Sequence, residues 1–379
     1  MKRIVHLIHG LNTGGAETLV KNYCLGLDKS KYKVTVLCYQ RLNSPYDRIL
    51  ADAGIEVLYA CDRMKMYGKK GFIAEAINDC QLLFVFRKML RELNPDILHT
   101  HLTLNIFVMF AGLSSNTQIF HTIHNQINVL WPRFSIIGNV DLLAAKWLVK
   151  HRGMRLITLY ENMKREADAL FKVNNSVVLN NGICFSDFEH AKDKMTMRDE
   201  LKIPQDAFIV GHVGRFSKQK NHEFLVDVFE EIYKQNDKAF LLMVGSGKKL
   251  DLIKAKLDAA SLQDRFLILS DRSDIADIMN AMDVFVFPSI YEGLGIALIE
   301  AQKSGLACLV SDAITNAAKV TDLVKMLSLT ETPKKWAEEA LNYRQIQSEA
   351  AANGNNQVPS DWNMTNVIRK LEQLYEGEI

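Results

Sequence analysis

Two acidic side chains, Glu292 and Glu300, flank a glycine turn in the segment YEGLGIALIE at residues 291–300. The segment follows the apolar run DVFVFP at 283–288, a pattern typical of a buried strand in a parallel sheet. Its two glycines allow a sharp turn and a close approach of the backbone to a ligand. A helix is predicted to begin near Ile296, which puts Glu292 in the loop above the strand and Glu300 about one turn into the helix.

This turn could bind a phosphate between two groups that accept hydrogen bonds from hydroxyls. The backbone amides at the predicted helix N-terminus, where anions are attracted, are those of Leu294, Gly295, Ile296 and Ala297. A nucleotide sugar offers the matching groups, because it carries a pyrophosphate, sugar hydroxyls and a ribose. The alternative for each glutamate is a solvated side chain. The placement of both around a glycine turn that follows a strand favours a ligand site.

Two cations follow a second predicted strand, at 207–213. Arg215 comes directly after Gly214, and Lys220 lies five residues further on. Cations just past the end of a strand can neutralise a pyrophosphate leaving group. Two basic residues usually mean only a solvated loop, but their position at the strand end beside Gly214 favours a functional role. A further strand and turn, GSG at 245–247, is explained equally well as a plain tight turn.

The segment LSDRSDI at 269–275 precedes another predicted helix. We predict that Arg272 and Ile275 contact the base of a bound nucleotide. For Ser273 and Asp274, which lie between them, a role as helix N-cap is the better explanation.

The first half of the chain opens with a glycine turn, NTGGAE at 12–17, between a strand and a helix. Gly14 and Gly15 could receive a phosphate or a sugar at the helix N-terminus. The turn is not GxGxxG, and the second strand ends in YQR at 39–41, without the acid that a dinucleotide ribose prefers. Both facts argue against a nicotinamide site.

Histidines stand at the ends of two strands in this half. His124 ends a strand predicted at 118–124, where it could orient a hydroxyl or stabilise developing charge. We prefer it to His121, although an isolated histidine is more often a satisfied structural residue. His99 and His101 form a further pair without an assigned role, and no metal is expected to bind there because matching ligands are not nearby in the sequence.

Strands and helices alternate along the whole chain, which is typical of doubly wound parallel sheets. In the first half, strands are predicted at 3–9, 32–39, 56–59, 97–101, 118–124, 155–159 and 176–179, with helices at 16–27, 78–93 and 139–149. In the second half, strands are predicted at 207–213, 239–244, 266–269, 283–287 and 307–311, with helices at 222–235, 250–260 and 275–281. The sequence therefore predicts two Rossmann-like lobes, 1–185 and 186–360, with a ligand cleft between them.

Composition is that of an ordinary globular enzyme. The chain has 379 residues, 48% hydrophobic and 24% charged, with a net charge of +2. Residues 1–185 carry 23 Lys and Arg against 14 Asp and Glu, so this half is basic and suits an anionic lipid surface or a diphosphate, unless the charges are ordinary scatter. The six scattered cysteines predict reduced thiols in the cytoplasm, and no apolar run is long enough to span a membrane.

Taken in order, these motifs resemble the retaining glycosyltransferases of family four, which have the GT-B fold. The resemblance covers nearly the whole chain. It is carried by NTGGAE at 12–17, His124-Asn125, Asn181-Gly182-Ile183, Gly214-Arg215 with Lys220, GSG at 245–247, and Glu292 with Glu300, which is similar to the family's EX7E motif. The subtype most similar to this chain makes bacterial exopolysaccharide or capsule.

The resemblance implies a role for each site residue. Glu292 would hold sugar hydroxyls and Glu300 the ribose diol, while Arg215 and Lys220 would bind the diphosphate. The amides of 294–297 would touch sugar and phosphate. Gly14 and Gly15 would lie near the phosphate, and His124 near the sugar and the acceptor. The family needs no metal, and this sequence has no DxD motif. The last helix, within 361–379, would pack back on the first lobe.

We therefore expect a metal-independent hexosyltransferase that moves a sugar from a nucleotide sugar, with UDP favoured, to a saccharide or a polyprenyl-diphosphate-linked saccharide. The alternatives are a GT-B sugar-nucleotide epimerase and a non-catalytic two-lobed binding protein. No nucleic acid is expected as a partner.

The apolar and basic segment QLLFVFRKMLR at 81–91, with Lys65, Lys69 and Lys70 nearby, could rest on the anionic inner face of the plasma membrane. A buried helix with a solvated face is the alternative.

Overall fold

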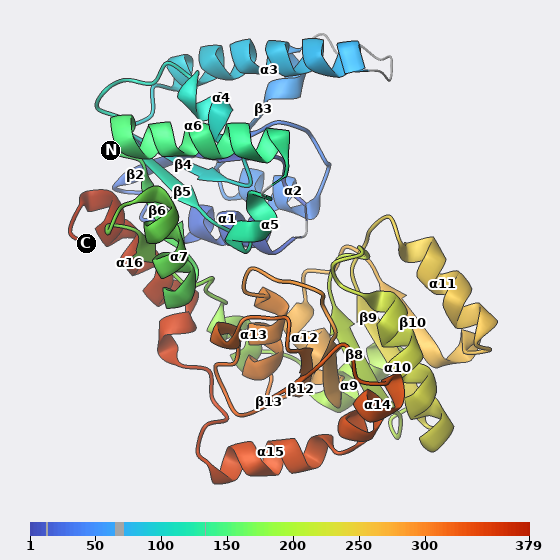
Figure 1. Ribbon diagram of the computed structural model, residues 1–379. Helices are drawn as coiled ribbons and strands as arrows, with labels where there is room; N and C mark the ends of the chain where they lie inside the picture. The colour runs from blue at the N-terminus through green and yellow to red at the C-terminus, as the bar shows by residue number, and fades with distance from the viewer. Residues whose placement is uncertain (13, 65–71, 133) are drawn as a thin grey trace. The chain divides into compact units, whose positions relative to one another are not determined.

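Two compact α/β units make up the protein (Figure 1). The computed structural model describes residues 1–12, 14–64, 72–132 and 134–379, so that Thr13 of the glycine turn and the loop lysines Lys65, Lys69 and Lys70 lie outside the described residues. The first unit comprises Met1–Asn181 together with Val367–Ile379, and the second comprises Gly182–Asn366.

The N-terminal unit is built on a sheet of seven parallel strands in the order β3-β2-β1-β4-β5-β6-β7. The strands are β1 (Lys2–Ile8), β2 (Tyr32–Cys38), β3 (Glu56–Tyr59), β4 (Ile97–His101), β5 (Gln118–Thr122), β6 (Arg155–Thr158) and β7 (Val177–Val178). The helices are α1 (Gly15–Gly26), α2 (Pro45–Asp52), α3 (Phe72–Leu93), α4 (Asn105–Met109), α5 (Ile127–Leu130), α6 (Ile136–Arg152), α7 (Glu161–Phe171) and most of α16 (Met364–Glu376).

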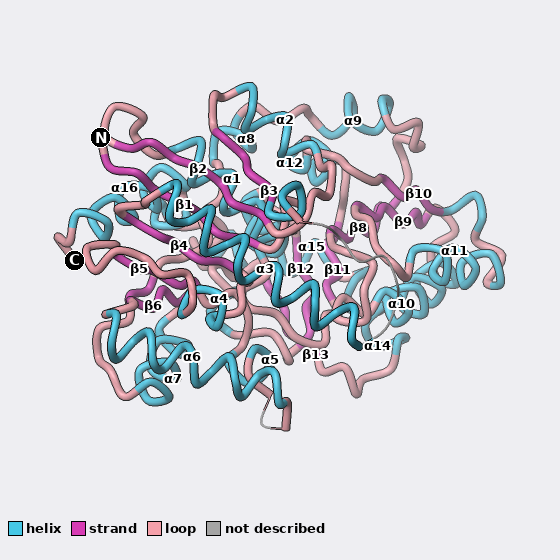
Figure 2. The backbone as a smooth tube through the Cα atoms, turned by 90° about the horizontal axis from the view of Figure 1, so that it is seen from above, coloured by secondary structure: helices cyan, strands magenta, loops and turns pink. Residues whose placement is uncertain are grey.

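The second unit is built on a sheet of six parallel strands in the order β10-β9-β8-β11-β12-β13. These are β8 (Phe208–Val213), β9 (Ala239–Val244), β10 (Phe266–Leu269), β11 (Val284–Phe287), β12 (Ala307–Ser311) and β13 (Val324–Leu327). The helices are α8 (Phe185–Glu189), α9 (Lys194–Glu200), α10 (His222–Gln235), α11 (Leu250–Ala259), α12 (Ile275–Asn280), α13 (Ile296–Lys303), α14 (Pro333–Leu341) and α15 (Tyr343–Ala352). Helices flank the strands of each sheet (Figure 2).

In each sheet the strand order reverses once, and the reversal fixes where a ligand can bind. The chain winds outward from β1 to β3 and then returns to the other side of β1 with β4. It does the same in the second unit, where β11 returns beside β8. At such a switch point the loops that follow the two central strands diverge, which leaves a crevice at their carboxyl ends. The loops after β1 and β4, and those after β8 and β11, are therefore the expected ligand positions.

Local sequence explains the ends of several helices. Helix α2 begins with a capping box in which Ser44 accepts a hydrogen bond from a backbone amide and Asp47 reaches back to the amide of Ser44, with a proline at the first turn. Helix α6 ends at Gly153, which has a φ of 61° in the left-handed region that favours glycine.

The predicted alternation of strands and helices is confirmed, with differences at the boundaries. The strand expected at 118–124 ends at Thr122, and the helix expected at 139–149 spans Ile136–Arg152. The first unit gives way to the second between Asn181 and Gly182, four residues before the predicted boundary. Residues Val367–Ile379 belong to the N-terminal unit.

All six cysteines carry free thiols. In the part of the chain that the structure describes, no helix has the length and apolar character needed to span a bilayer.

The last helix is held on the N-terminal unit by both apolar and polar contacts. Tyr375 is fully buried, and its hydroxyl lies 2.6 Å from His99 Nδ1. Glu376 accepts a hydrogen bond from the Tyr32 hydroxyl at 2.7 Å and pairs with Lys2 at 2.6 Å. Gly26 leaves room for Ile368, because a Cβ on this glycine would lie 2.8 Å from Ile368 Cγ1.

A buried ion pair anchors the start of β11 in the second unit. Asp283 accepts hydrogen bonds from the Arg198 guanidinium at 2.8 Å and from the Ile209 amide at 2.7 Å. Arg198 is 4% exposed and also donates to three backbone carbonyls. This network connects α9 to the two central strands of the sheet, because Ile209 belongs to β8 and Asp283 immediately precedes β11.

We predict that Asp283→Ala lowers the free energy of unfolding by about 3–5 kcal/mol, because it leaves the Arg198 guanidinium buried without its carboxylate. Urea unfolding measures the change. The control is Asp206→Ala, which removes an exposed ion pair with Lys238 and is expected to change stability little. Equal effects of the two substitutions would contradict this assignment.

Candidate functional site

Lys220 and Glu292 form an ion pair at the switch point of the second sheet. Lys220 follows β8 and Glu292 follows β11, and the Lys220 Nζ lies 2.8 Å from Glu292 Oε1. The same ammonium group lies 4.2 Å from the centre of the Phe287 ring, within the range of a cation–π interaction. Both charged side chains are largely buried, with exposed fractions of 14% and 8%. The prediction that these two charges belong to one site on the sheet is therefore consistent with the geometry.

Glycines let the loops of this site approach one another closely. The amide of Gly214 donates to the carbonyl of Val244 at 2.9 Å. Gly245 has a φ of 149°, and a Cβ on it would lie 2.1 Å from the Gly214 carbonyl oxygen. The strand-ending turn at 245–247 therefore has a packing role, which the sequence alone left open. A Cβ on Gly214 would lie 3.0 Å from the Lys220 side chain, so this glycine lets Lys220 fold back over the strand end.

The loop after β11 is tied to the loop after β8 by backbone bonds. The amide of Ile290 donates to the Gln219 carbonyl at 2.8 Å, and the Gln219 side chain donates to the Tyr291 carbonyl at 3.0 Å. Ser289 lies in the same loop, and its buried hydroxyl has no hydrogen-bond partner among the described residues. Sequence analysis did not select Ser289, because a single serine after a strand carries no distinguishing pattern.

Helix α13 presents uncapped amides beside the ion pair. Its N-cap residue is Gly295, with a φ of 80°, and no side chain caps the helix. A Cβ on Gly295 would lie 3.7 Å from the Glu292 side chain, so the helix start and the acid are neighbours. The first amides of an α-helix have no partner within it, and they attract anions together with the helix dipole. The predicted amides, those of Leu294, Gly295, Ile296 and Ala297, lie at this helix start.

The other predicted donor residues lie on three elements of the second unit. Arg215 is exposed in the loop after β8, and Glu300 is half-buried on α13. Arg272 pairs with the carboxylate of Asp274 through two nitrogens, which raises the pKa of Arg272. Asp274 is the N-cap residue of α12, as favoured from the sequence, but its side chain makes no capping bond. The contacts of Arg272 and Ile275 with a base stay predictions.

Two buried imidazoles lie beneath the loop after β8. His212 Nδ1 donates to the Val286 carbonyl at 2.8 Å, which leaves its Nε2 as the unprotonated nitrogen. The ring of His222 lies 4.6 Å from that of His212. Burial lowers the pKa of His212 to about 3 and that of His222 to about 2. Both rings are neutral at neutral pH and add no positive charge beside Lys220.

The predicted residues of the N-terminal unit lie at the carboxyl ends of its strands. Gly14 is the N-cap residue of α1 without a capping side chain, and Gly15 is the first residue of the helix. His124 follows β5 and is half-buried. Its Nε2 lies 3.0 Å from Nδ1 of His101. His121, the less favoured candidate, instead faces the hydroxyl of Thr100, 2.7 Å from its Nδ1.

Three histidines of this unit are close enough together to hold a metal ion. Ligand nitrogens of His6, His99 and His101 lie within 4.8 Å of one another. His99 already uses both ring nitrogens, one with the Tyr375 hydroxyl and one with the Thr122 hydroxyl, each at 2.6 Å. His101 also uses both, with His6 and His124. A metal would have to replace these bonds, so the geometry favours a hydrogen-bonded cluster.

Comparison with known proteins relates the two units to two protein families. Residues 13–186 match the model described as Glycosyltransferase Family 4, and residues 193–351 match the model described as Glycosyl transferases group 1. The chain is 30% identical to the putative glycosyltransferase EpsF of Bacillus subtilis over 352 residues, which cover 89% of this chain and 86% of that protein.

Two further similarities concern a galactosyltransferase and a solved structure. A UDP-Gal:alpha-D-GlcNAc-diphosphoundecaprenol alpha-1,3-galactosyltransferase of Escherichia coli is 30% identical over 248 residues, 62% of each chain. The crystal structure of HepE from Anabaena in complex with UDP and glucose superposes with a TM-score of 0.78 over 99% of this chain and all of that chain, at 16% identity. The likeness to HepE shows the fold alone.

We predict that acid destabilises the N-terminal unit at pH values where most carboxylates are still ionised. Burial lowers the pKa of His6 and of His124 from 6.5 to about 3, and neighbouring His121 contributes at His124. At these two positions the unfolded chain therefore binds a proton each as the pH falls below 6.5, whereas the folded chain binds them only near pH 3. Their contribution to stability is constant above about pH 6.5 and falls below it, by up to about 1.4 kcal/mol per pH unit for each histidine.

Urea unfolding between pH 7.5 and 5 measures this dependence. His6→Asn is expected to remove one histidine's share of the slope, and His190→Asn, which replaces an exposed ring, is expected to leave it unchanged. A wild-type stability that does not vary across this interval would contradict the prediction.

Proposed function

The chain belongs to glycosyltransferase family 4, and on that basis we propose that it transfers a sugar from a UDP-sugar, with retention of the anomeric configuration and without a metal ion. We propose a saccharide or a polyprenyl-diphosphate-linked saccharide as the acceptor, in the synthesis of a surface polysaccharide. The observation that carries the proposal is the Lys220–Glu292 pair at the switch point of the second sheet. The name of the galactosyltransferase, and the UDP and glucose bound to HepE, support the substrate classes.

Lys220 and Glu292 can separate and bind opposite ends of the nucleotide sugar. A buried charge needs a partner, and without a ligand Lys220 and Glu292 neutralise each other. In our proposal a diphosphate attracts Lys220, with Arg215 from the same loop, and Glu292 is released to accept hydrogen bonds from sugar hydroxyls. Binding then exchanges one charge pair for another and leaves no uncompensated charge in the site.

The remaining roles in the proposal are those that the family resemblance implies. The amides at the start of α13 would bind phosphate and sugar oxygens, and Glu300 the ribose diol. Arg272 and Ile275 would contact the base. In the N-terminal unit, Gly14 and Gly15 would approach a phosphate at the start of α1, and His124 would hydrogen-bond a sugar or acceptor oxygen.

We propose that the acceptor attacks from the side of the leaving group. The bond between the anomeric carbon and the diphosphate oxygen breaks, the acceptor oxygen bonds to the same carbon, and the acceptor proton passes to the departing diphosphate. Lys220 and Arg215 stabilise the charge that develops on that leaving group. Losing one such contact typically costs about a hundredfold or more in rate. The cations and the helix dipole supply this stabilisation, and for that reason the proposal includes no metal.

We predict that Glu292→Gln and Lys220→Met have opposite effects on nucleotide binding. Glu292→Gln frees Lys220 from its carboxylate, so the affinity for UDP stays equal or rises while sugar transfer falls about a hundredfold or more. Lys220→Met weakens binding of both UDP and UDP-sugar. Calorimetric titration and a transfer assay measure these effects, and Lys238→Met, at an exposed ion pair, is the control.

The same assay separates the rival functions. An epimerised sugar nucleotide without a glycoside product would indicate a GT-B epimerase, and binding of UDP-sugar without transfer or hydrolysis would indicate a binding protein. Wild-type transfer rates in both variants would sink the assignment of the site.

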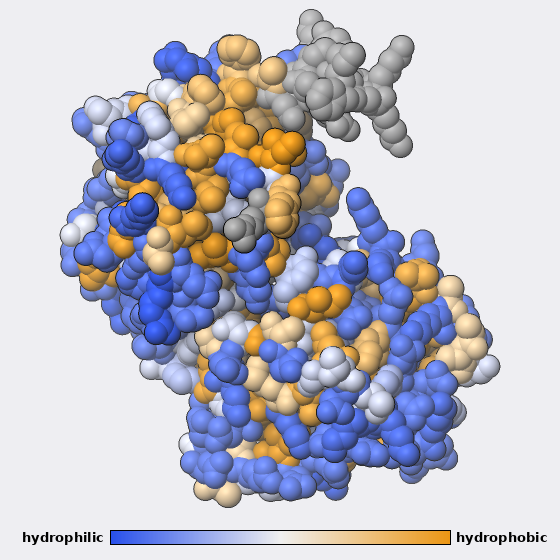
Figure 3. All heavy atoms as spheres, in the orientation of Figure 1, coloured by the Kyte–Doolittle hydropathy of each residue, from blue (hydrophilic) through white to orange (hydrophobic). Residues whose placement is uncertain are grey.

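We further propose that the N-terminal unit contacts an anionic membrane, at the inner face of the plasma membrane, through α6 and the adjoining α4 and α3. Five large apolar residues of α6 are exposed: Ile136, Ile137, Val140, Leu143 and Trp147. Phe134, just before α6, is 95% exposed, and Phe110, just after α4, is 49% exposed. Figure 3 shows apolar side chains gathered over this part of the N-terminal unit.

Helix α6 exposes five large apolar side chains and buries mainly small or apolar residues, with the carboxylate of Asp141 among them. The buried carboxylate of Asp141 accepts hydrogen bonds from Asn105 Nδ2 at 3.0 Å and from the Trp131 indole at 2.8 Å. The exposed residues 136, 140, 143 and 147 recur every three or four positions, so they form one stripe along the helix. An exposed apolar patch rimmed by polar residues marks an interaction site.

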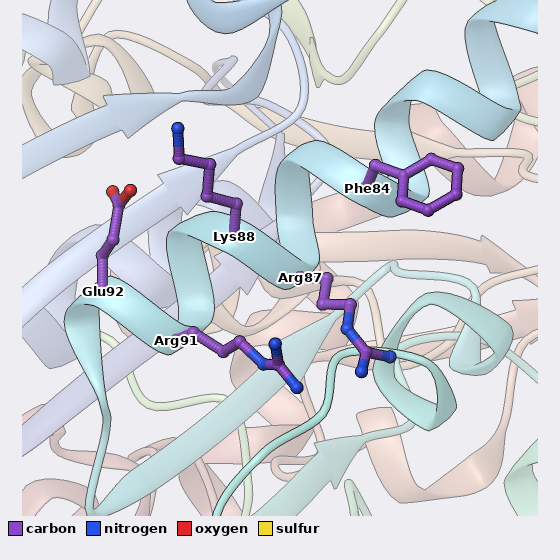
Figure 4. Close-up of a pocket in the computed structure, with 5 residues that line it drawn as sticks. All are labelled: Phe84, Arg87, Lys88, Arg91 and Glu92. Carbon is purple, nitrogen blue, oxygen red and sulfur yellow. The ribbon is translucent and has the colours of Figure 1, made fainter.

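Basic residues border this stripe, which favours an anionic bilayer as the partner. The last turn of α6 carries Lys150, His151 and Arg152. On α3, Arg87 and Arg91 extend to the same side of the helix and line a shallow pocket with Phe84, Lys88 and Glu92 (Figure 4). Arg87 donates to the Phe110 carbonyl at 3.2 Å, so α3 reaches the end of α4. Such residues attract anionic lipid headgroups.

The segment that the sequence suggested for this contact, 81–91, is only partly exposed. Phe86, Met89 and Leu90 are buried, and of its apolar residues Phe84 alone is fully exposed. The segment therefore matches the alternative, a packed helix with a solvated basic face. The larger apolar surface on α6 was not predicted.

We expect the protein to co-sediment with vesicles containing phosphatidylglycerol, and to do so less as salt rises. Leu143→Asp should weaken this binding without unfolding the protein, because Leu143 is 67% exposed. Leu252→Asp, at a residue 50% exposed on α11, is the matched control. Equal binding to neutral vesicles would count against the proposal, and a concentration-dependent dimer abolished by Leu143→Asp would assign the surface to a second copy of the chain.

A further inference from the structure

Three histidines of the N-terminal unit form a hydrogen-bonded chain that ends at His124. His6 lies on β1, His101 at the end of β4, and His124 just after β5. The Nδ1 of His6 lies 3.1 Å from Nε2 of His101, and Nδ1 of His101 lies 3.0 Å from Nε2 of His124. His6 and His101 are fully buried, and His124 is half-buried. The chain thus runs from the core to the carboxyl end of the sheet.

All three rings are neutral at neutral pH. Burial lowers the pKa of His6 and His124 to about 3 and holds that of His101 well below its ordinary value, with a further contribution from the neighbouring imidazoles at His101 and His124. A neutral imidazole carries one proton, on either Nδ1 or Nε2, and the other nitrogen accepts. Each contact between two rings therefore holds a single proton.

Only two proton arrangements make both hydrogen bonds. In the first, His6 and His101 donate from Nδ1, so His124 accepts at Nε2 and carries its own proton on Nδ1. In the second, His124 and His101 donate from Nε2, so the proton of His6 lies on its Nε2 and Nδ1 of His124 is a bare acceptor. The three protons change position together, because one ring cannot change tautomer without breaking a bond.

The environment of His6, at the buried end of the hydrogen-bonded histidines, decides between these arrangements. Nε2 of His6 is buried and has no hydrogen-bond partner among the described residues. The first arrangement leaves an unused lone pair there, whereas the second leaves an unsatisfied N–H. Buried N–H groups without a partner are rarer in proteins than under-satisfied acceptors. The first arrangement is therefore favoured.

We propose that His6 and His101 are positioning residues that hold His124 as the Nδ1–H tautomer, so that its Nδ1 donates a hydrogen bond to an oxygen of the bound sugar or acceptor. This inference rests on the proposed function for the nature of that oxygen. The hydrogen bonds between the three histidines do not depend on it. Nδ1 of His124 makes no hydrogen bond to the described residues, so it is available to a ligand. His124 then acts as a neutral donor, neither as a cation nor as a base.

Nitrogen-15 NMR of histidine-labelled protein tests the tautomers directly. We expect the wild type at pH 7 to show His124 protonated on Nδ1 and His6 unprotonated on Nε2. His101→Leu removes the donor to His124, so it should mix the tautomers of His124 and lower kcat by up to about 10-fold, the usual effect of losing one neutral hydrogen bond. His101→Asn, with the same branching but an N–H in place of a methyl group, should preserve the tautomer and most of kcat.

Three results would overturn the proposal. The first is a wild-type His124 protonated on Nε2 or charged at pH 7. The second is a His101→Leu variant with unchanged tautomer and turnover. The third is a stoichiometric metal ion found by elemental analysis, bound by the histidines. His190→Asn, at an exposed ring of the second unit, controls for unspecific effects. The spectrum reports the histidine tautomers whether or not the protein transfers sugar. Failure of UDP binding would therefore contradict the proposed function and still leave the tautomer prediction testable.

Discussion

A charged or polar group buried at the end of a parallel strand must find its partner inside the protein, and this constraint shapes both units. Lys220 and Glu292 are far apart in the sequence and would each be costly to bury alone. The strand order β8-β11 brings their loops together, and the pair satisfies both charges at 2.8 Å. A site of this kind is stable without a ligand and still polar enough to exchange its partners for those of a ligand.

The same constraint takes a different form in the N-terminal unit. Here the groups at the strand ends are imidazoles, and burial keeps them neutral instead of paired with acids. Neutral rings can satisfy one another only by sharing protons in a fixed order, so His6 and His101 determine what His124 can offer a ligand. His99, in the same cluster, is satisfied by the hydroxyls of Thr122 and Tyr375. The last helix, which carries Tyr375, thereby contributes to the core beneath His124.

Gly245 and helix α6 show how packing is arranged in the two units. Gly245 lets two strand ends meet at a distance that a side chain would prevent. Helix α6 buries the carboxylate of Asp141 beside Ala144, Ala145 and Leu148, and it also exposes a stripe of larger apolar side chains. We propose a membrane surface as the partner of this stripe because basic residues border it.

The sequence by itself determined the alternation of strands and helices, the two doubly wound units, and the glycine turn with Glu292 and the helix start after it, because these depend on local periodicity and turn chemistry. It also selected Lys220 and His124 by their positions at strand ends. The partners of these residues were decided by tertiary structure. Strand order and register decide that Lys220 pairs with Glu292 and that His6 is linked to His124 through His101. The outward face of α6 was decided in the same way, because a periodic apolar stripe looks the same in a sequence whether a sheet or solvent lies against it.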